Sequence, residues 1–139
     1  MENVQSKVVS CASFFPYFTG LSVDKEGAKL LLSTLELPFG VSATDGSVEG
    51  NYQWGYKNGW ACMQLVAVEG LFRCGLQSEA KRVADKYTSL VEKVYTETGK
   101  LWEKYNVMDG NANAVGEYGT PEMLGWTAGV YLALTHKKY

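Results

Sequence analysis

The sequence predicts an all-α fold in which antiparallel inner and outer helices form pairs, and two observations support this. First, an apolar helix, an amphipathic helix and a second apolar helix follow one another along the chain. An apolar helix must be covered by other elements, whereas an amphipathic helix keeps one face in water, so this order is typical of inner helices covered by outer ones. Second, the alternation of apolar and polar residues that marks half-buried strands is scarce. The loops before the two apolar helices should then lie together at one end and line a cleft.

The composition is that of a globular protein, and we expect a single helical domain over residues 1–139. Of the 139 residues, 46% are hydrophobic and 20% are charged, so the chain can bury a core without disulfides or a metal ion. The formal net charge is -2, which excludes the broad basic surface of a nucleic-acid-binding protein. No apolar run reaches the length of about 18 residues that a membrane span needs, so we expect no membrane partner.

The first part of the chain is predicted to hold an irregular segment, a helix and a long loop. Residues 1–23 crowd aromatic side chains around Pro16, which lacks an amide hydrogen and disfavours a continuous helix. Asp24 is suited to cap the helix that follows, which continues to residue 37 before Pro38 ends it. Residues 39–57 contain four glycines among Ser, Thr, Asp and Asn, which favour turns. Loops of this length in compact domains usually bind or catalyse.

The second part is predicted to alternate helices with one further loop. Asn58 is expected to cap the first of these helices and Gly75 to end it. The second helix carries one apolar stripe, from Ala80 to Tyr95, and therefore faces water on its other side. The last helix is apolar and is expected to be buried. The segments are a helix over 59–74, a helix over about 78–98, a loop over 100–123 and a helix over 124–135.

The cysteines and the histidine indicate the compartment and limit the chemistry. Cys11, Cys62 and Cys74 cannot all pair within one chain, so reduced thiols are expected. The first residues lack the basic stretch and the apolar run of a signal peptide, and together these observations predict a cytoplasmic protein. His136 lies near a predicted helix C-terminus, where a cation is favoured, and no second ligand is spaced to share a metal ion with it. We therefore expect neither a metal site nor a cofactor.

Aromatic side chains stand beside acids and amides in both loops. A sugar ring has apolar CH faces and a rim of hydroxyls, so a carbohydrate site needs flat rings to stack on and polar groups for hydrogen bonds. The alternative is structural, since a single Glu is most often a surface charge and a Trp at a helix start most often belongs to the core. The candidates are Gln53, Trp54, Tyr56, Asn58, Trp60 and Gln64 from the first loop, and Trp102, Glu103, Tyr105, Glu117, Tyr118 and Trp126 from the second.

Four blocks of the sequence resemble, in order, the trehalases of glycoside hydrolase family 37. Residues 53–64, QWGYKNGWACMQ, are similar to the family signature Q-W-D-x-P-N-G-W-A-P-x-Q. Gly55 stands where the signature has aspartate, and Lys57 and Cys62 stand where it has proline. The other blocks are TGKLWEKYNV (98–107), GEY (116–118) and GWTAGVYLAL (125–134), similar to the family's K-L-V-E-K-Y-D-V, G-E-Y and G-W-T-N-G-V.

The resemblance implies an inverting hydrolase of α,α-trehalose that is built as an (α/α)6 toroid, with this chain as the C-terminal part of the catalytic domain. Such an enzyme uses one carboxyl group as an acid and another as a base. By its place in the E-K-Y motif, Glu103 is implied to be the general base. The implied substrate-binding residues are Gln53, Trp54, Asn58, Trp60, Glu117, Tyr118 and Trp126.

The general acid of the family is an aspartate well upstream, accompanied by arginines that hold the sugar hydroxyls, and this chain has no room for those segments. We therefore expect the chain to carry the base half of a partial toroid, completed by an N-terminal catalytic segment or by a second copy of the chain. Two alternatives stay open. One is a catalytically silent trehalase-like module for binding or assembly, and the other is a toroid enzyme that acts on a different sugar.

Overall fold

The computed structural model describes residues 6–122 and 125–137. These residues form five α-helices and four strands of two or three residues each, which confirms the predicted all-α class. The helices are α1 (Phe15–Phe18), α2 (Lys25–Leu35), α3 (Ala61–Arg73), α4 (Gln77–Thr98) and α5 (Gly125–His136), and a 3-10 turn, η1, covers Cys11–Phe14. The strands are β1 (Glu36–Leu37), β2 (Gly40–Val41), β3 (Asn58–Trp60) and β4 (Lys104–Asn106).

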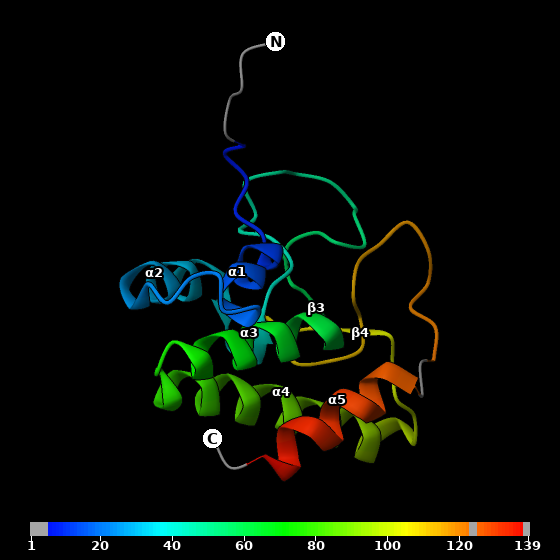
Figure 1. Ribbon diagram of the computed structural model, residues 1–139. Coiled ribbons are helices and arrows are strands. Elements are labelled where there is room, and N and C mark those ends of the chain that lie inside the picture. The colour runs from blue at the N-terminus through cyan, green and yellow to red at the C-terminus, as the bar shows by residue number, and fades with distance from the viewer. Residues whose placement is uncertain (1–5, 123–124, 138–139) are drawn as a thin grey trace.

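Helix α3 is the centre of the fold. It packs against η1 and α1 on one side and against α4 and α5 on the other (Figure 1). Nine of its 13 residues are buried, as expected for an apolar helix that is covered all round. Gly70 lets α1 come close, because a Cβ at this position would lie only 3.1 Å from the Cβ of Tyr17. The prediction of an inner helix at this point of the chain is confirmed.

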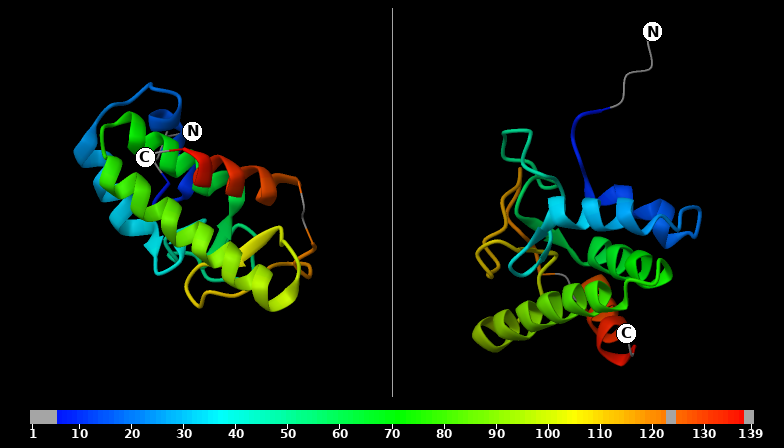
Figure 2. Two further views of the ribbon diagram at one scale, coloured as in Figure 1. Left: turned by 90° about the horizontal axis from the view of Figure 1, so that it is seen from below. Right: turned by 90° about the vertical axis from the view of Figure 1, so that its left-hand side faces the viewer.

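Helix α4 is the outer partner of α3. Gly75 adopts a φ of 74°, which suits glycine and turns the chain back, so that α4 packs along α3. The two helices lie side by side with α5 in the views of Figure 2. The predicted apolar stripe is buried as far as Val94, but Tyr95 is 53% exposed. The inclusion of Tyr95 in the stripe is wrong because α4, with 22 residues, outruns the 13 residues of α3.

Helix α5 is apolar but is buried on one side only. Its buried residues are Thr127, Val130 and Leu134, whereas Leu132 is 51% exposed. The expectation of a fully buried helix is wrong, because α5 packs against α3 and α4 and no described element covers its other side. The predicted first residue, Leu124, lies outside the described residues.

Helix α2 begins as predicted and ends earlier. The Asp24 carboxylate accepts hydrogen bonds from the amides of Glu26 and Gly27, each at 3.1 Å, and so caps the helix. The helix stops at Leu35, because the next two residues form β1 and pair with β2 across the Pro38 turn. The segment predicted to be irregular contains η1 and α1, and Pro16 is tolerated there because it lies in the first turn of α1.

A two-stranded ladder joins the two long loops. Strands β3 and β4 pair antiparallel, with Asn58 opposite Asn106 and Trp60 opposite Lys104. Gly59 is required in this ladder, because a Cβ there would collide with Val107. The prediction that Asn58 caps α3 is wrong, since its backbone belongs to β3 and the helix begins at Ala61 without a side-chain cap. The ladder brings both loops to the N-terminal end of α3, as predicted (Figure 1).

Candidate functional site

One buried amide fastens the two loops to each other. The side chain of Asn58 is fully buried, and its Nδ2 lies 2.9 Å from the carbonyl oxygen of Gln53 and 2.6 Å from that of Val115. Its Oδ1 accepts a hydrogen bond of 3.0 Å from the amide of Val115. The amide of Gln53 donates in turn to the Glu117 carboxylate at 2.7 Å. These bonds fix the backbone around the site, because a buried amide with all its partners present holds one geometry.

Three tryptophans form an aromatic wall beside this frame. Trp60 is 3% exposed, and its indole N–H donates to the carbonyl oxygen of Gln53 at 2.9 Å. Trp54 stacks on Trp60 with ring centroids 4.0 Å apart and an interplanar angle of 7°. Trp126 meets Trp60 edge to face at 5.5 Å. Because Trp54 is 43% exposed and stacks on the buried Trp60, it offers a flat apolar ring that is held in place. Such a ring suits the face of a sugar.

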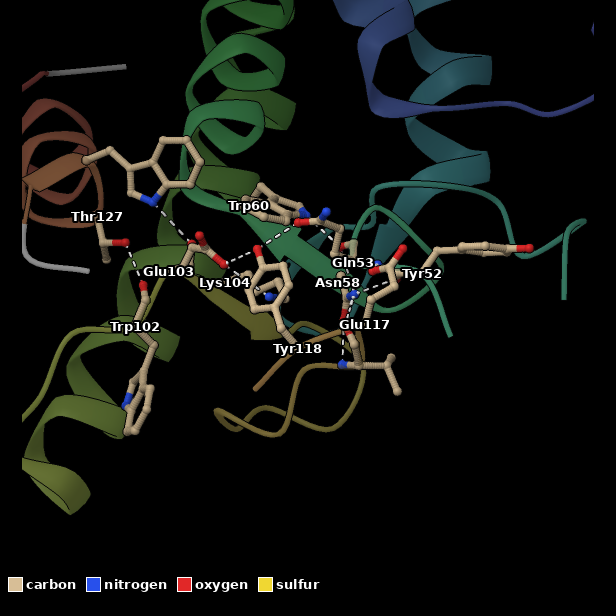
Figure 3. A network of polar contacts seen from close by, with 12 residues as sticks. Tyr52, Gln53, Asn58, Trp60, Trp102, Glu103, Lys104, Glu117, Tyr118 and Thr127 are labelled. Carbon is tan, nitrogen blue, oxygen red and sulfur yellow. Dashed lines mark hydrogen bonds and ion pairs between the residues drawn. The ribbon is translucent and has the colours of Figure 1, made fainter. Parts of the chain in front are cut away.

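Glu103 is held at the start of β4 by one of its two carboxylate oxygens (Figure 3). Its side chain is only 12% exposed. Oε2 accepts a hydrogen bond of 2.7 Å from the Tyr118 hydroxyl and lies 3.1 Å from the ammonium group of Lys104. The indole N–H of Trp126 donates to the backbone carbonyl of Glu103 at 3.2 Å. Within the described residues, no hydrogen bond reaches Oε1, so this oxygen is available to a water molecule or a ligand.

Tyr118 connects Glu103 with the first loop. Its hydroxyl lies 2.7 Å from Glu103 Oε2 and 2.7 Å from Gln53 Oε1. Desolvation, the hydrogen bond to Glu103 and the charges of Glu103 and Glu117 raise the pKa of Tyr118 to about 12. Tyr118 is therefore protonated at neutral pH and can donate its hydroxyl hydrogen to Glu103 Oε2.

Lys104 is a site residue that the sequence reasoning missed. None of its side chain is exposed, and its ammonium group lies 4.2 Å from the ring centroid of Tyr118 and 5.1 Å from that of Trp60. The signal was present, because Lys104 is the lysine of the E-K-Y block that contains Glu103. Its burial could not be inferred from that block.

The structure brings all eight predicted site residues to the end of the molecule where the loops meet. Asn58 and Trp60 are buried and use their polar atoms within the protein, so they form the frame. Gln64, a further candidate, lies apart from Glu103 and bonds the backbone of Val41 at 2.8 and 2.7 Å. Among the remaining predicted residues, Trp54, Glu117 and Tyr118 are exposed, whereas Gln53 and Trp126 are half-buried.

A cavity of about 420 Å³ lies between the loops, where a cleft was predicted. Val48 and Glu49 line it from the first loop, and Asn113 and Val115 from the second. Glu103 is not among its lining residues, so this cavity and the carboxylate are separate features of the same end of the molecule.

The described residues carry no cluster that points to a metal ion. Within 6–122 and 125–137, no three His, Cys, Asp or Glu side chains are placed to hold one. No helix in that part of the chain is long and apolar enough to cross a membrane. All three cysteines are free. Burial raises the thiol pKa of Cys11 to about 12, with a smaller contribution from Cys62, which makes this thiol unreactive.

Comparison with known proteins identifies relatives that match more than nine tenths of the chain. The statistical model of the trehalase family matches residues 1–138. The periplasmic trehalase of Pseudomonas aeruginosa is 37% identical over 131 residues, which cover 91% of this chain and 24% of that protein. The periplasmic trehalase of Xanthomonas axonopodis pv. citri is 36% identical and covers 93% of this chain and 23% of its own length. The chain thus spans about a quarter of these relatives.

Solved structures show the same fold. The neutral trehalase of Saccharomyces cerevisiae matches 94% of this chain and 24% of its own, with a TM-score of 0.76 and 28% identity. A mannosylglycerate hydrolase of glycoside hydrolase family 63 from Thermus thermophilus matches 92% of this chain and 31% of its own, with a TM-score of 0.64 and 20% identity. These neighbours confirm the predicted partial (α/α)6 toroid.

The comparisons also overturn one prediction. The matched bacterial relatives are named periplasmic trehalases, so the predicted cytoplasmic location is wrong. The inference from cysteines failed because Cys11 and Cys74 are buried and need no reducing compartment to stay free.

Proposed function

Because this chain belongs to the trehalase family, we propose that it supplies the general-base half of a site that hydrolyses α,α-trehalose to glucose. The proposal extends to this chain the activity named in its periplasmic relatives. One observation carries it: Glu103 is fixed through Oε2 while Oε1 has no hydrogen-bond partner among the described residues. A carboxylate in that state can accept a proton from water without losing its own position.

The steps follow from what an inverting glycosidase requires. Two carboxyl groups lie about 6.5–9.5 Å apart, and a water molecule fits between the base and the sugar. Glu103 Oε1 accepts a proton from this water as its oxygen attacks the anomeric carbon. The acid, which protonates the leaving glycosidic oxygen, comes from outside this chain, either from the remaining three quarters of a protein like its relatives or from a second copy.

Other groups at the meeting point of the two loops bind the sugar in this proposal. Trp54 offers its ring to the CH face of a glucosyl unit, and Glu117 and Gln53 accept hydrogen bonds from hydroxyls. Asn58 and Trp60 act on the substrate through the backbone of residue 53, to which both are bonded. We take residues 1–139 as one helical domain of the larger enzyme.

We also propose a periplasmic location, following the names of the bacterial relatives. The free thiols are compatible with an oxidising compartment. Cys11 and Cys74 are buried, and burial raises the pKa of all three thiols, which suppresses the thiolate that oxidation requires.

Glucose release from trehalose tests the proposal. The purified chain is assayed alone and as a chimera, in which it replaces the matching segment of the Pseudomonas aeruginosa relative. We expect the chimera to be active and Glu103→Gln to lower its kcat by roughly 10²–10⁴-fold, the loss typical of a missing general base. Glu36→Gln is the matched control, because the Glu36 side chain is equally buried, at 13% exposed, and lies in β1.

Two outcomes would contradict the proposal. A Glu103→Gln chimera with unchanged kcat would show that Glu103 is not the base. A folded chimera without activity on trehalose would favour the silent binding module, in which case the departure at Gly55 from the signature aspartate becomes the first suspect. Activity on another glucoside in place of trehalose would assign the chain to a different sugar.

A further inference from the structure

Lys104 differs from every other cation that forms an ion pair in the described residues. In the remaining pairs the cationic side chain is between 29% and 60% exposed. The side chain of Lys104 is 0% exposed. A buried ammonium group is strongly unfavourable unless its charge is compensated, so the surroundings of Lys104 must account for its presence.

The compensation comes from one carboxylate and two aromatic rings. Glu103 Oε2 lies 3.1 Å from the ammonium nitrogen, and the rings of Tyr118 and Trp60 lie within the range of cation–π attraction. The β3–β4 register sets Lys104 directly opposite Trp60, which fixes where its backbone lies. The titratable side chains that contact the Glu103 carboxylate in the described residues are Lys104 and Tyr118, and Glu117 is the further charge acting on Tyr118.

We propose that Lys104 is the positioning residue of the general base: its buried cation holds Glu103 Oε2, so that Oε1 faces the water. The catalytic meaning of this proposal rests on the proposed function of Glu103. Lys104 has no exposed surface and acts only through the carboxylate. Packing alone does not require a cation, because a methionine of similar length fills the same space between the rings without a charge to compensate.

The ion pair is tested first on the chain itself, without any assay of activity. Urea unfolding midpoints are measured for Lys104→Met, Glu103→Gln and the double variant. We expect Lys104→Met to lower the midpoint, and the double variant to lower it by clearly less than the sum of the two single changes. The exposed pair of Lys81 and Asp85, with side chains 60% and 61% exposed, is the matched control and should behave additively. Additive midpoints for Lys104 and Glu103 would overturn the proposal.

The positioning role is then tested by kinetics in the chimera. Lys104→Met should lower kcat by roughly 10- to 100-fold, the loss that follows from a misplaced catalytic group. Its KM should stay nearly constant because Lys104 does not touch substrate. Lys104→Arg keeps a cation and should recover part of kcat. Lys104→Gln, which keeps a hydrogen-bond donor without charge, serves as a second neutral variant if Lys104→Met does not fold.

The kinetics distinguish a failure of the base role of Glu103 from a failure of the positioning role of Lys104. If Glu103→Gln loses kcat and Lys104→Met does not, Lys104 is not a positioning residue and the function of Glu103 stands. If kcat survives Glu103→Gln, both proposals are overturned. A rise in KM as large as the loss of kcat would assign Lys104 to substrate binding and would also contradict the positioning role.

Discussion

Two carboxylates of this molecule, Glu36 and Glu103, have the same burial and different surroundings. Their side chains are 13% and 12% exposed. Both oxygens of Glu36 are taken: Arg82 donates to Oε1 and Oε2 at 2.8 Å each, and Lys86 donates to Oε1 at 2.7 Å. In Glu103 all the hydrogen bonds found in the described residues fall on Oε2. Burial next to a cation is therefore common to both carboxylates, and they differ in whether both oxygens have hydrogen-bond partners among the described residues.

The surroundings of Glu36 indicate a structural role. Burial raises its pKa, but the hydrogen bonds and charges of Arg82 and Lys86 outweigh this effect and leave the pKa below its usual value. Glu36 stays ionised and ties β1 to α4. The Glu103 carboxylate contacts one buried cation, Lys104, and one hydroxyl group, that of Tyr118. Both contacts fall on Oε2, so Oε1 has no hydrogen-bond partner among the described residues.

Among the variants compared by stability, we expect the largest loss from removing the Asn58 side chain, which fixes the backbone around the site. Asn58→Ala deletes a buried side chain that bonds the backbone of residue 53 on one loop and both backbone groups of Val115 on the other. Because buried partners are left unsatisfied, we expect a loss of about 2–4 kcal/mol in the free energy of unfolding. Urea unfolding measures it.

Asn51→Ala is the matched control for Asn58→Ala. Asn51 is exposed and donates one hydrogen bond to Gly116 at 2.9 Å, so its removal should lower the free energy of unfolding by about 0.5–1 kcal/mol. Equal losses for the two variants would show that Asn58 does not hold the loops. The ion pairs of Glu36 with Arg82 and Lys86 should stay intact in both variants.

A second variant removes the charge of Glu36, the other carboxylate of the pair. Glu36→Gln removes the charge shared by Arg82 and Lys86, and we expect a loss of about 1–2 kcal/mol in the free energy of unfolding at neutral pH. Because the folded pKa of Glu36 is lowered, its contribution is complete above the unfolded value of about 4.3 and disappears as the pH falls through the folded pKa. The difference from wild type should therefore shrink in acid.

Unfolding at neutral and at successively lower pH measures this difference. Glu26→Gln is the control, since Glu26 pairs with Lys29 on the surface and its side chain is 83% exposed. That variant should change the free energy of unfolding by less than about 0.5 kcal/mol at any pH. A destabilisation by Glu36→Gln that stayed constant down to strongly acid pH would mean that the charge of Glu36 is not what matters.

Much of the fold follows from periodicity in the sequence. The apolar pattern of α3 and the single stripe of α4 predict their burial, because a helix face is decided by residues close in sequence. The end of α2 and the start of α3 were not predictable in the same way. Glu36 leaves its predicted helix because it pairs with Val41 across a turn, and Asn58 leaves its predicted cap position because it pairs with Asn106. Helical periodicity does not show such pairing.

The candidate site shows the same division. Glu103 and Trp54 could be found from motif resemblance, because each stands inside a contiguous block. The burial of Lys104 could not, since it depends on Trp60 across the ladder and on Tyr118, 14 residues further along the second loop. The exposure of Leu132 was missed for the opposite reason: its helix is apolar, but no described element covers that side.

The pKa of Tyr118 is a local readout of the charge on Glu103 and does not involve unfolding. The pKa of Tyr118 is raised to about 12 by desolvation, by its hydrogen bond to Glu103 and by the charges of Glu103 and Glu117. Glu103→Gln removes the charged acceptor, so the pKa of Tyr118 should fall toward its ordinary value near 10. Glu117→Gln should lower it less, because Glu117 acts through its charge alone, and Glu36→Gln should leave it unchanged.

Carbon-13 labelling of the tyrosine ring, with Tyr118→Phe for assignment, follows this ionisation by NMR. The three variants are compared by how far each lowers the pKa of Tyr118. The desolvation of Tyr118 is the same in all of them, so a difference between them reports the charge or hydrogen bond that was removed. A fall of equal size for Glu103→Gln and Glu117→Gln would mean that Tyr118 senses only the total charge nearby. A larger fall for Glu103→Gln would support the hydrogen bond from the Tyr118 hydroxyl to Glu103 Oε2, the contact that occupies this oxygen and leaves Oε1 without a partner among the described residues.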